Sequence, residues 1–172
     1  SEARIDENGN RIVATNNCLW LTNLDHGRRH QPLPLMTMME NLKYSKHKEI
    51  KGKKSYDKYD NYDAIEIPFT DAIPSDYKGV MGVPVTFLDK YNPEQFEILG
   101  ITKTWYGGAS KIYPNQIQVN ADSSKSVVSK LNDGAAIKVS APPHDKTYYM
   151  VDNDYFIQLY ARILIKRKGL AQ

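Results

Sequence analysis

The sequence contains a single cysteine, so no disulfide can form within the chain and no cysteine-rich zinc site can be built. This residue, Cys18, lies in a strand-like run, which favours a small buried side chain over a nucleophile. No apolar run approaches the roughly 18 residues that a membrane span needs. The first residues also lack the basic and apolar regions of a signal peptide. We therefore expect a cytoplasmic protein with no membrane partner.

The common catalytic signatures are also missing. The chain has no G-x-G-x-x-G, no Walker loop, no G-x-S-x-G and no H-E-x-x-H. His26 and His30 are four residues apart, but Gly27 and Pro32 break the helix that a metal-binding pair would need. The run YDKYDNYD at residues 56–63 could align carboxylates, yet it lacks the glycine and the bidentate glutamate of a calcium loop. We expect no metal site and no catalytic residue in this chain.

Length and composition are those of an ordinary folded domain. With 172 residues, 41% of them apolar and 25% charged, the chain is long enough to bury a core and is expected to form one domain. Short β-rich runs separated by turn residues outnumber helical patterns. The sequence therefore predicts an α+β fold, mostly antiparallel β with few short helices.

Several elements can be placed along the chain. Three methionines between residues 36 and 39 suggest one or two helical turns packed on the core, and the lysine-rich residues 43–58 suggest a mobile loop. A serine or aspartate start signal and a following glycine predict a helix over residues 123–132. Residues 82–88 and 95–102 are expected to pair as antiparallel strands, with Phe87, Leu88, Phe96, Ile98 and Leu99 in the core. Further strands are expected at residues 12–15, 18–24, 64–69, 112–119 and 135–140, and a hairpin at 147–151 with 155–165 across residues 152–154.

The charges are unevenly distributed, although the 23 basic and 20 acidic residues give a net charge of only +3. Seven lysines against Glu49 and Asp57 give residues 43–58 a local charge of +5, and residues 162–168 carry four cations and no acid. Twelve tyrosines add stacking faces with polar tips. This combination suits nucleic acid, and a solvated basic surface explains it about as well.

Five stretches resemble the C-terminal part of the EcoRI-type adenine-specific DNA methyltransferases, in the order in which that family has them. They span roughly residues 11–168, although residues 105–150 are not recognisable. The stretches are LWLTNLD at 19–25 followed by Arg28-Arg29, KYDNYDAI at 58–65, IPSDY at 73–77, GVMGVPVTFLDKYNPEQFEILG at 79–100 and YARILIKRK at 160–168.

The resemblance implies transfer of a methyl group from S-adenosylmethionine to the exocyclic amine of an adenine flipped out of duplex DNA, within a restriction-modification system. In that family an Asn-Pro-Pro-aromatic loop holds the amine and a glycine-rich turn binds the cofactor. Neither is present, since the one Pro-Pro pair, Pro142-Pro143, is preceded by Ala141 and followed by His144. We expect the catalytic half to precede residue 1, as part of the same polypeptide. Residues 1–172 would then be the C-terminal, DNA-handling portion.

Double-stranded DNA is the expected partner. Base edges are read by Arg, Lys, Asn or Gln, and phosphates are held by Lys and Arg. A solvated loop is the alternative explanation for each candidate. The candidate DNA-binding residues are Arg28, Arg29, His30, Lys58, Asn61, Lys103, Trp105 and Lys111.

Two other interpretations stay open. The chain could be a stand-alone, non-enzymatic nucleic-acid-binding or assembly module, or a protein-interaction domain whose tyrosines make the contacts. If residues 11–24 normally pair with a missing catalytic sheet, their unpaired edge would also favour self-association of the isolated chain.

We predict that this chain alone neither methylates DNA nor binds S-adenosylmethionine, because both motifs that the resemblance requires for these tasks are absent. Isothermal titration calorimetry with S-adenosylmethionine should give no heat of binding. Micromolar affinity for the cofactor would contradict the prediction.

Overall fold

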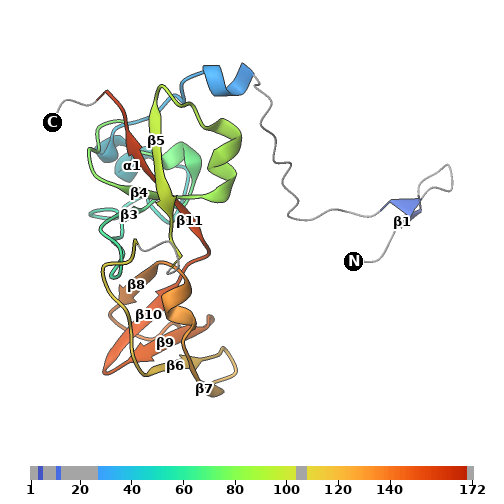
Figure 1. Ribbon diagram of the computed structural model, residues 1–172, viewed down its shortest axis with the longest axis vertical. Helices are drawn as coiled ribbons and strands as arrows, with labels where there is room; N and C mark the ends of the chain where they lie inside the picture. The colour runs from blue at the N-terminus through green and yellow to red at the C-terminus, as the bar shows by residue number, and fades with distance from the viewer. Residues whose placement is uncertain (1–3, 6–10, 13–26, 104–107, 170–172) are drawn as a thin grey trace.

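The computed structural model describes residues 4–5, 11–12, 27–103 and 108–169. Within these residues it contains two main sheets, which lie one above the other in Figure 1, and few short helices. The fold is therefore α+β and mostly antiparallel β, as the sequence predicts. No helix among the described residues is long and apolar enough to cross a membrane.

The upper sheet has four strands in the order β3-β4-β11-β5. Strands β3 and β4 are parallel, and the other neighbours are antiparallel. The strands are β3 (Ile65–Glu66), β4 (Met81–Pro84), β11 (Arg162–Arg167) and β5 (Phe96–Ile101).

The lower sheet has five strands in the order β7-β6-β9-β10-β8, and all its neighbours are antiparallel. A separate pair joins β1 (Arg4–Ile5) to β2 (Arg11–Ile12). The strands of the lower sheet are β7 (Lys125–Val128), β6 (Gln116–Val119), β9 (Tyr148–Val151), β10 (Asp154–Gln158) and β8 (Ala136–Val139).

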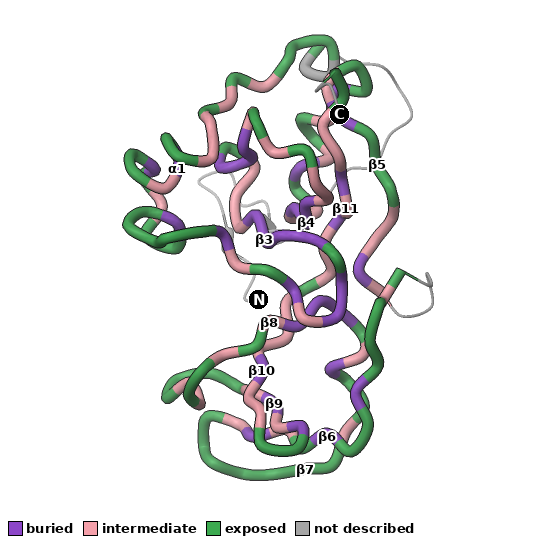
Figure 2. Tube along the Cα trace, turned by 90° about the vertical axis from the view of Figure 1, so that its left-hand side faces the viewer, coloured by how far each residue is buried: buried purple, intermediate pink, exposed green. Residues whose placement is uncertain are grey.

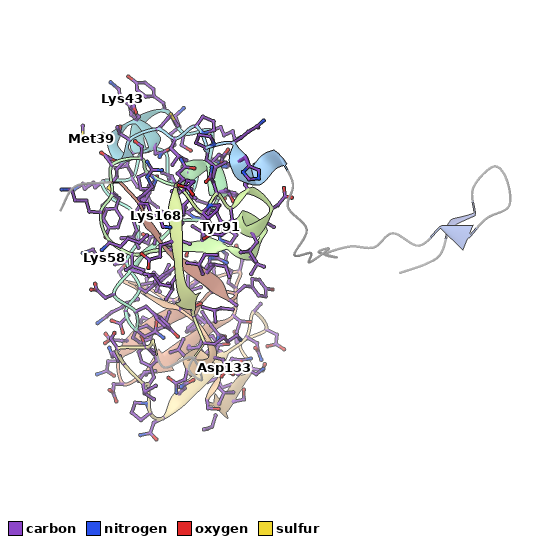
Figure 3. The ribbon with its side chains drawn as sticks, turned by 45° about the horizontal axis from the view of Figure 1, so that its top comes forward. Met39, Lys43, Lys58, Tyr91, Asp133 and Lys168 are labelled. Carbon is purple, nitrogen blue, oxygen red and sulfur yellow. The ribbon has the colours of Figure 1, made fainter. Side chains whose placement is uncertain are left out.

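Helix α1 (Met38–Tyr44) starts at a capping box. The Thr37 hydroxyl accepts from the Glu40 backbone N–H, and the Glu40 carboxylate accepts from the Thr37 backbone N–H at 2.8 Å. Met38 packs on the core of the upper sheet, whereas Met39 is 78% exposed and points outward (Figure 3). The predicted helical turns are thus present, but only part of the methionine patch is in the core.

Strand β11 is the centre of the upper sheet, and the predicted pairing of residues 82–88 with 95–102 is wrong. β4 and β5 each pair with β11 and lie on opposite sides of it. Ile163 and Ile165 of β11 are buried between them. A strand from the chain's end thus separates two strands that are close neighbours in sequence, which local patterns cannot reveal.

The strand expected at residues 82–88 ends at Pro84, which has no N–H for the ladder. The chain continues as the 3-10 helix η3 (Val85–Lys90), which buries Phe87 completely. Phe96 is also in the core and Leu88 packs on it, as expected, but Ile98 and Leu99 are 39% and 47% exposed. The expectation was therefore wrong for these two residues, which lie on the edge strand β5.

The helix predicted over residues 123–132 is also wrong, because the region forms strand β7 and the 3-10 helix η5 (Lys130–Asp133). Asp122 accepts from the Ser124 backbone N–H and hydroxyl, and Ser123 has a φ of 67°. The Asp-Ser signal is therefore a hairpin turn between β6 and β7 and not a helix cap. The β-branched Val127 and Val128 pair with β6.

The predicted hairpin across residues 152–154 is confirmed as β9 and β10, with Asp152 at a φ of 53° in the turn. The expected long strand over residues 155–165 is divided. Its first part is β10 in the lower sheet, and its last part belongs to β11 in the upper sheet. Tyr160, 91% exposed, lies where the chain crosses between the sheets.

The lysine-rich residues 43–58 are folded against the upper sheet, contrary to the mobile loop expected from sequence. Ile50 and Tyr56 are buried at 1% and 6% exposure. The Tyr56 hydroxyl donates to the Ala72 carbonyl at 2.7 Å, and Gly52 donates its N–H to the Leu42 carbonyl at 2.8 Å. The segment has no apolar stripe, but the apolar side chains of Ile50 and Tyr56 both belong to the core of the upper sheet.

Residues 56–64, here called the tyrosine segment, join the two sheets. Asp60 donates its N–H to the Ala136 carbonyl of β8 at 2.8 Å. The Asn61 amide donates to the Gly134 carbonyl at 2.9 Å and accepts from the Ala136 N–H at 2.8 Å. Figure 2 shows this junction as a buried region between the sheets. Tyr59 and Tyr62 are buried there with Ala135.

We predict that Asn61→Ala lowers the free energy of unfolding by about 1–3 kcal/mol. The change leaves the buried Gly134 carbonyl and Ala136 N–H without partners. Urea unfolding followed by circular dichroism measures the loss. Lys58→Ala, which alters an exposed side chain of the same segment, is the control, and equal stabilities of the two variants would contradict the prediction.

Candidate nucleic-acid interface

The first group of predicted DNA-binding residues lies in the 3-10 helix η1 (Gly27–His30), at the top of the upper sheet in Figure 1. His30 is exposed and lines a hollow with residues of β11. The backbone of Arg28 and Arg29 belongs to η1, and their side chains lie outside the described part of the chain. Trp105 also lies outside the described residues.

A second group lies at the junction between the sheets, at the end of the upper sheet away from η1. Lys58 is exposed, and its backbone forms an isolated bridge with Ile65. Asn61 is 1% exposed, and its amide group is used entirely within the fold. Its geometry therefore supports a structural role and leaves no part of the amide for a base edge.

Lys111 is held at this junction by the tyrosine segment. Its ammonium group lies 2.6 Å from the Asp60 carboxylate and 5.1 Å from the centre of the Tyr113 ring. The Tyr113 hydroxyl donates to the same carboxylate at 2.6 Å. The ion pair fixes Lys111 without burying it, so that this cation stays exposed at the surface. Lys103 is half-buried just after β5.

A cleft of about 620 Å³ lies between the lysine-rich segment and strands β8 and β10. Ile50, Tyr56, Ile137 and Ile157 form part of its apolar lining. Four cations and three acids line the same cleft. These are Glu49, Lys53, Asp57, Glu66, Lys138, Lys146 and Arg162.

Two lysines at the cleft are held by exposed ion pairs. Lys53 lies 2.6 Å from Asp57, and Lys138 lies 2.8 Å from Asp154. Their side chains are 40% and 52% exposed. Such exposed pairs contribute only about 0–1 kcal/mol, so a phosphate group can compete for either lysine.

A buried ion pair forms the polar wall of the cleft. Arg162 donates from Nε at 3.1 Å and from Nη2 at 2.8 Å to the Glu66 carboxylate, and the two side chains are 14% and 7% exposed. Burial lowers the pKa of Arg162, but the hydrogen bonds and charge of Glu66 outweigh burial and raise it. The Tyr59 hydroxyl donates to the same carboxylate, and burial raises the pKa of Tyr59.

No group of three His, Cys, Asp or Glu side chains among the described residues could hold a metal ion. Of the three carboxylates at the cleft, those of Asp57 and Glu66 are paired with Lys53 and Arg162.

Sequence reasoning missed the cations that the fold brings to the cleft from distant strands. Lys138 and Lys146 lie on or after β8, and Arg162 begins β11. The sequence does show the cations of residues 162–168 and an exposed position at Lys138, but the register of β8 and its place beside the cleft cannot be read from local sequence. The cleft itself depends on how two sheets pack.

Comparisons with known proteins converge on one family. A family model described as "Adenine-specific methyltransferase EcoRI" matches residues 1–168. Type II methyltransferase M.EcoRI of Escherichia coli is 56% identical over 103 residues, which cover 60% of this chain and 28% of that protein. Type II methyltransferase M.MpnI of Mycoplasma pneumoniae is 41% identical over 80 residues, covering 46% and 22%. The matched regions thus cover less than a third of the length of each of these relatives. No solved structure matches it.

The hydrogen bonds of Asp60 predict how the stability of the fold depends on pH. Burial would raise the pKa of Asp60, but hydrogen bonds from Lys111 and Tyr113 and nearby positive charge outweigh burial and lower it. A lowered carboxyl pKa stabilises the fold above the unfolded value of about 3.9, and this stabilisation is lost as the pH falls through the folded pKa. Asp60→Asn should therefore be less stable than the unaltered chain at pH 7, with a difference that shrinks below about pH 4.

Thermal unfolding from pH 3 to pH 8 measures this difference, with the exposed Asp63→Asn as the control. A gap between Asp60→Asn and the unaltered chain that is independent of pH would contradict the prediction.

Proposed function

Because the chain belongs to the EcoRI family of adenine-specific methyltransferases, we propose that it is the C-terminal, DNA-handling portion of such an enzyme in a restriction-modification system. The complete enzyme would transfer a methyl group from S-adenosylmethionine to the N6 amine of adenine. The catalytic half, upstream in the same polypeptide, would supply the cofactor site and the chemistry. The family match over residues 1–168 carries this proposal, and the absence of both catalytic motifs from the chain supports the division of roles.

The charge arrangement supports contact with the backbone of duplex DNA. Lys51, Lys53, Lys54 and Lys58 are exposed on the lysine-rich segment, and Lys146 is exposed on the other side of the cleft. Side chains at these positions can move toward a phosphate without disturbing the core. Contacts of this type add affinity and set the position of the protein on DNA, but they carry no sequence information.

Sequence reading, by contrast, requires rigid groups that reach base edges. Arg28 and Arg29 are the proposed readers, because a guanidinium can bond guanine through two parallel hydrogen bonds. His30, Lys103, Trp105 and Lys111 remain proposed contacts. Asn61 has a structural role that argues against including it.

The exposed apolar side chains of the upper sheet support a second partner, the catalytic half of the same polypeptide. Ile98 and Leu99 lie on β5, an edge strand of this sheet. Exposed apolar edge positions of this kind favour pairing or packing with another element. Self-association of the isolated chain is proposed for the edge at residues 11–24, of which residues 13–24 lie outside the described residues. We place the complete enzyme in the cytoplasm, where duplex DNA is available in bacteria such as the sources of its relatives.

We predict that the isolated chain binds duplex DNA mainly through phosphates. Each phosphate contact adds about −0.9 to the slope of log K against log salt, and non-specific binding of this type has a Kd of about 10⁻⁴ to 10⁻⁶ M at physiological salt. Fluorescence anisotropy with a labelled duplex at several salt concentrations measures both quantities. Binding that is absent, or that does not change with salt, would overturn the proposal.

The same anisotropy titration distinguishes the proposed arginine contacts from the lysine contacts to phosphates. Replacing Arg28 and Arg29 by Ala should weaken binding more than replacing Lys51 and Lys54 by Ala, because a guanidinium binds bidentately to guanine or phosphate. Equal losses for the two double variants would remove Arg28 and Arg29 from the proposed interface.

A further inference from the structure

A second hollow lies at the C-terminal end of β11, next to η1. It has a volume of about 360 Å³, and its polar lining is His30, Asn92, Glu94, Gln95, Arg167 and Lys168. Figure 1 shows the end of β11 and the start of β5 at the same end of the upper sheet, where η1 also lies. The hollow is formed by three segments that are distant in sequence, namely residues 30–32, 92–95 and 167–168. Lys168, in the last of them, is labelled in Figure 3.

The Arg167 guanidinium has hydrogen-bonding capacity that the described residues do not use. Its Nε and Nη1 atoms are buried and have no hydrogen-bond partner among these residues. Its Cζ lies 5.4 Å from the centre of the Phe96 ring, which is a cation-π contact. Burial lowers the pKa of Arg167, but an arginine remains protonated at neutral pH.

Arg162, at the other end of β11, has the carboxylate partner that Arg167 lacks among the described residues. Arg162 is half-buried and its fork is filled by the Glu66 carboxylate. Arg167 has no such carboxylate among the hydrogen bonds and ion pairs of the described chain. A buried donor that lacks an acceptor costs about 1–3 kcal/mol, and more when it is charged. An external anion at Arg167 would remove this cost.

The uncharged walls of the hollow are already fixed by internal bonds. The Gln95 side chain accepts from the Leu33 N–H at 2.7 Å and donates to the Leu33 carbonyl at 2.9 Å. Its backbone carbonyl accepts from the Lys168 N–H at 3.0 Å. The Asn92 side chain accepts from the Glu94 N–H at 2.9 Å. Gln95 therefore connects the segment that follows η1, at Leu33, to the end of β11, at Lys168.

The charges that line the hollow favour an anion. Arg167 and Lys168 are cationic, His30 adds a third basic group, and Glu94 is the one acid in the lining. The planar fork of an arginine matches two oxygens of a phosphate, while a lysine adds a point charge. A backbone phosphate of DNA supplies both the oxygens and a charge that persists at neutral pH, and duplex DNA is the partner of the proposed function.

We propose that this hollow binds one phosphate of the DNA backbone, held by the cationic side chains of Arg167 and Lys168. The inference rests on the proposed function, because the phosphate belongs to the duplex that the chain handles. It adds a defined anchor on the η1 side of the upper sheet, away from the inter-sheet cleft. Such an anchor would set the register of Arg28 and Arg29 on DNA, since they immediately precede His30.

The test uses the chain with a labelled 20-base-pair duplex over a series of salt concentrations. If Arg167→Gln abolishes the contact, it should reduce the salt slope by about 0.9 and weaken binding roughly eightfold near 0.1 M salt, since one counterion fewer is released. Lys168→Gln should lower the slope and the affinity in the same direction but by less, because Arg167 still contacts the phosphate. Arg167→Lys should keep most of the slope, because the positive charge is retained, but bind more weakly than the unaltered chain, because a lysine lacks the planar guanidinium. Lys125→Gln, on β7 of the lower sheet, is the matched control and should change neither quantity.

The outcomes separate this inference from the proposed function. If the unaltered chain does not bind the duplex, the proposed function fails and the inference with it. If it binds with a salt slope that Arg167→Gln and Lys168→Gln both leave unchanged, DNA binding stands and the inference fails. Lys168→Gln keeps the test valid if a change at Arg167 disturbs folding, because Lys168 is exposed.

A second measurement identifies the anion. The ¹⁵N resonance of the Arg167 Nε–H group should shift on addition of the duplex and much less with inorganic phosphate at the same phosphate concentration. A shift with inorganic phosphate alone would overturn the assignment to DNA, and no shift with either would show that the hollow takes no phosphate.

Discussion

The ion pair between Arg162 of β11 and Glu66 of β3 is the interaction on which the upper sheet depends at the point where the chain arrives from the lower sheet. Arg162 opens β11 directly after the chain leaves the lower sheet, and Glu66 ends β3. The same carboxylate accepts from Tyr59 of the tyrosine segment. Removing one partner of a buried pair typically costs about 3–5 kcal/mol, because it leaves an uncompensated charge. The Glu66 carboxylate therefore joins the upper sheet, the tyrosine segment and the start of β11, where the chain arrives from the lower sheet.

This constraint also determines which surfaces remain for partners. A side chain at position 82 would collide with the hydroxyl and ring of Tyr59. Glycine at this position therefore lets Tyr59 reach Glu66. The carboxylates of the junction face inward or are paired, as Glu66 and Asp60 are. Cations are left at the rim of the cleft and at the end of β11. A chain with a net charge of only +3 can therefore present local basic surfaces to DNA.

Sequence patterns predicted what depends on neighbouring residues, and failed where distant segments meet. The hairpin at Asp152 and the helical turns after Thr37 were predictable, because turn and capping residues act locally. The helix expected over residues 123–132 failed because Asp and Ser also favour hairpin turns. The pairing of β4 and β5 with β11, the burial of Asn61 and the unfilled fork of Arg167 follow from packing between distant strands. The family resemblance identified the family, but no local signal separates a structural asparagine from a DNA-binding one.

We propose that one set of basic sites on this chain contacts duplex DNA while the tyrosine segment keeps the two sheets together. Hydrogen exchange with mass spectrometry, with and without a 20-base-pair duplex, tests this most directly. Slower exchange is predicted at residues 27–33, in the lysine-rich residues 43–58 and at the end of β11. No change is predicted in the hairpin of β6 and β7. Unchanged exchange throughout, or protection confined to that hairpin, would contradict the account.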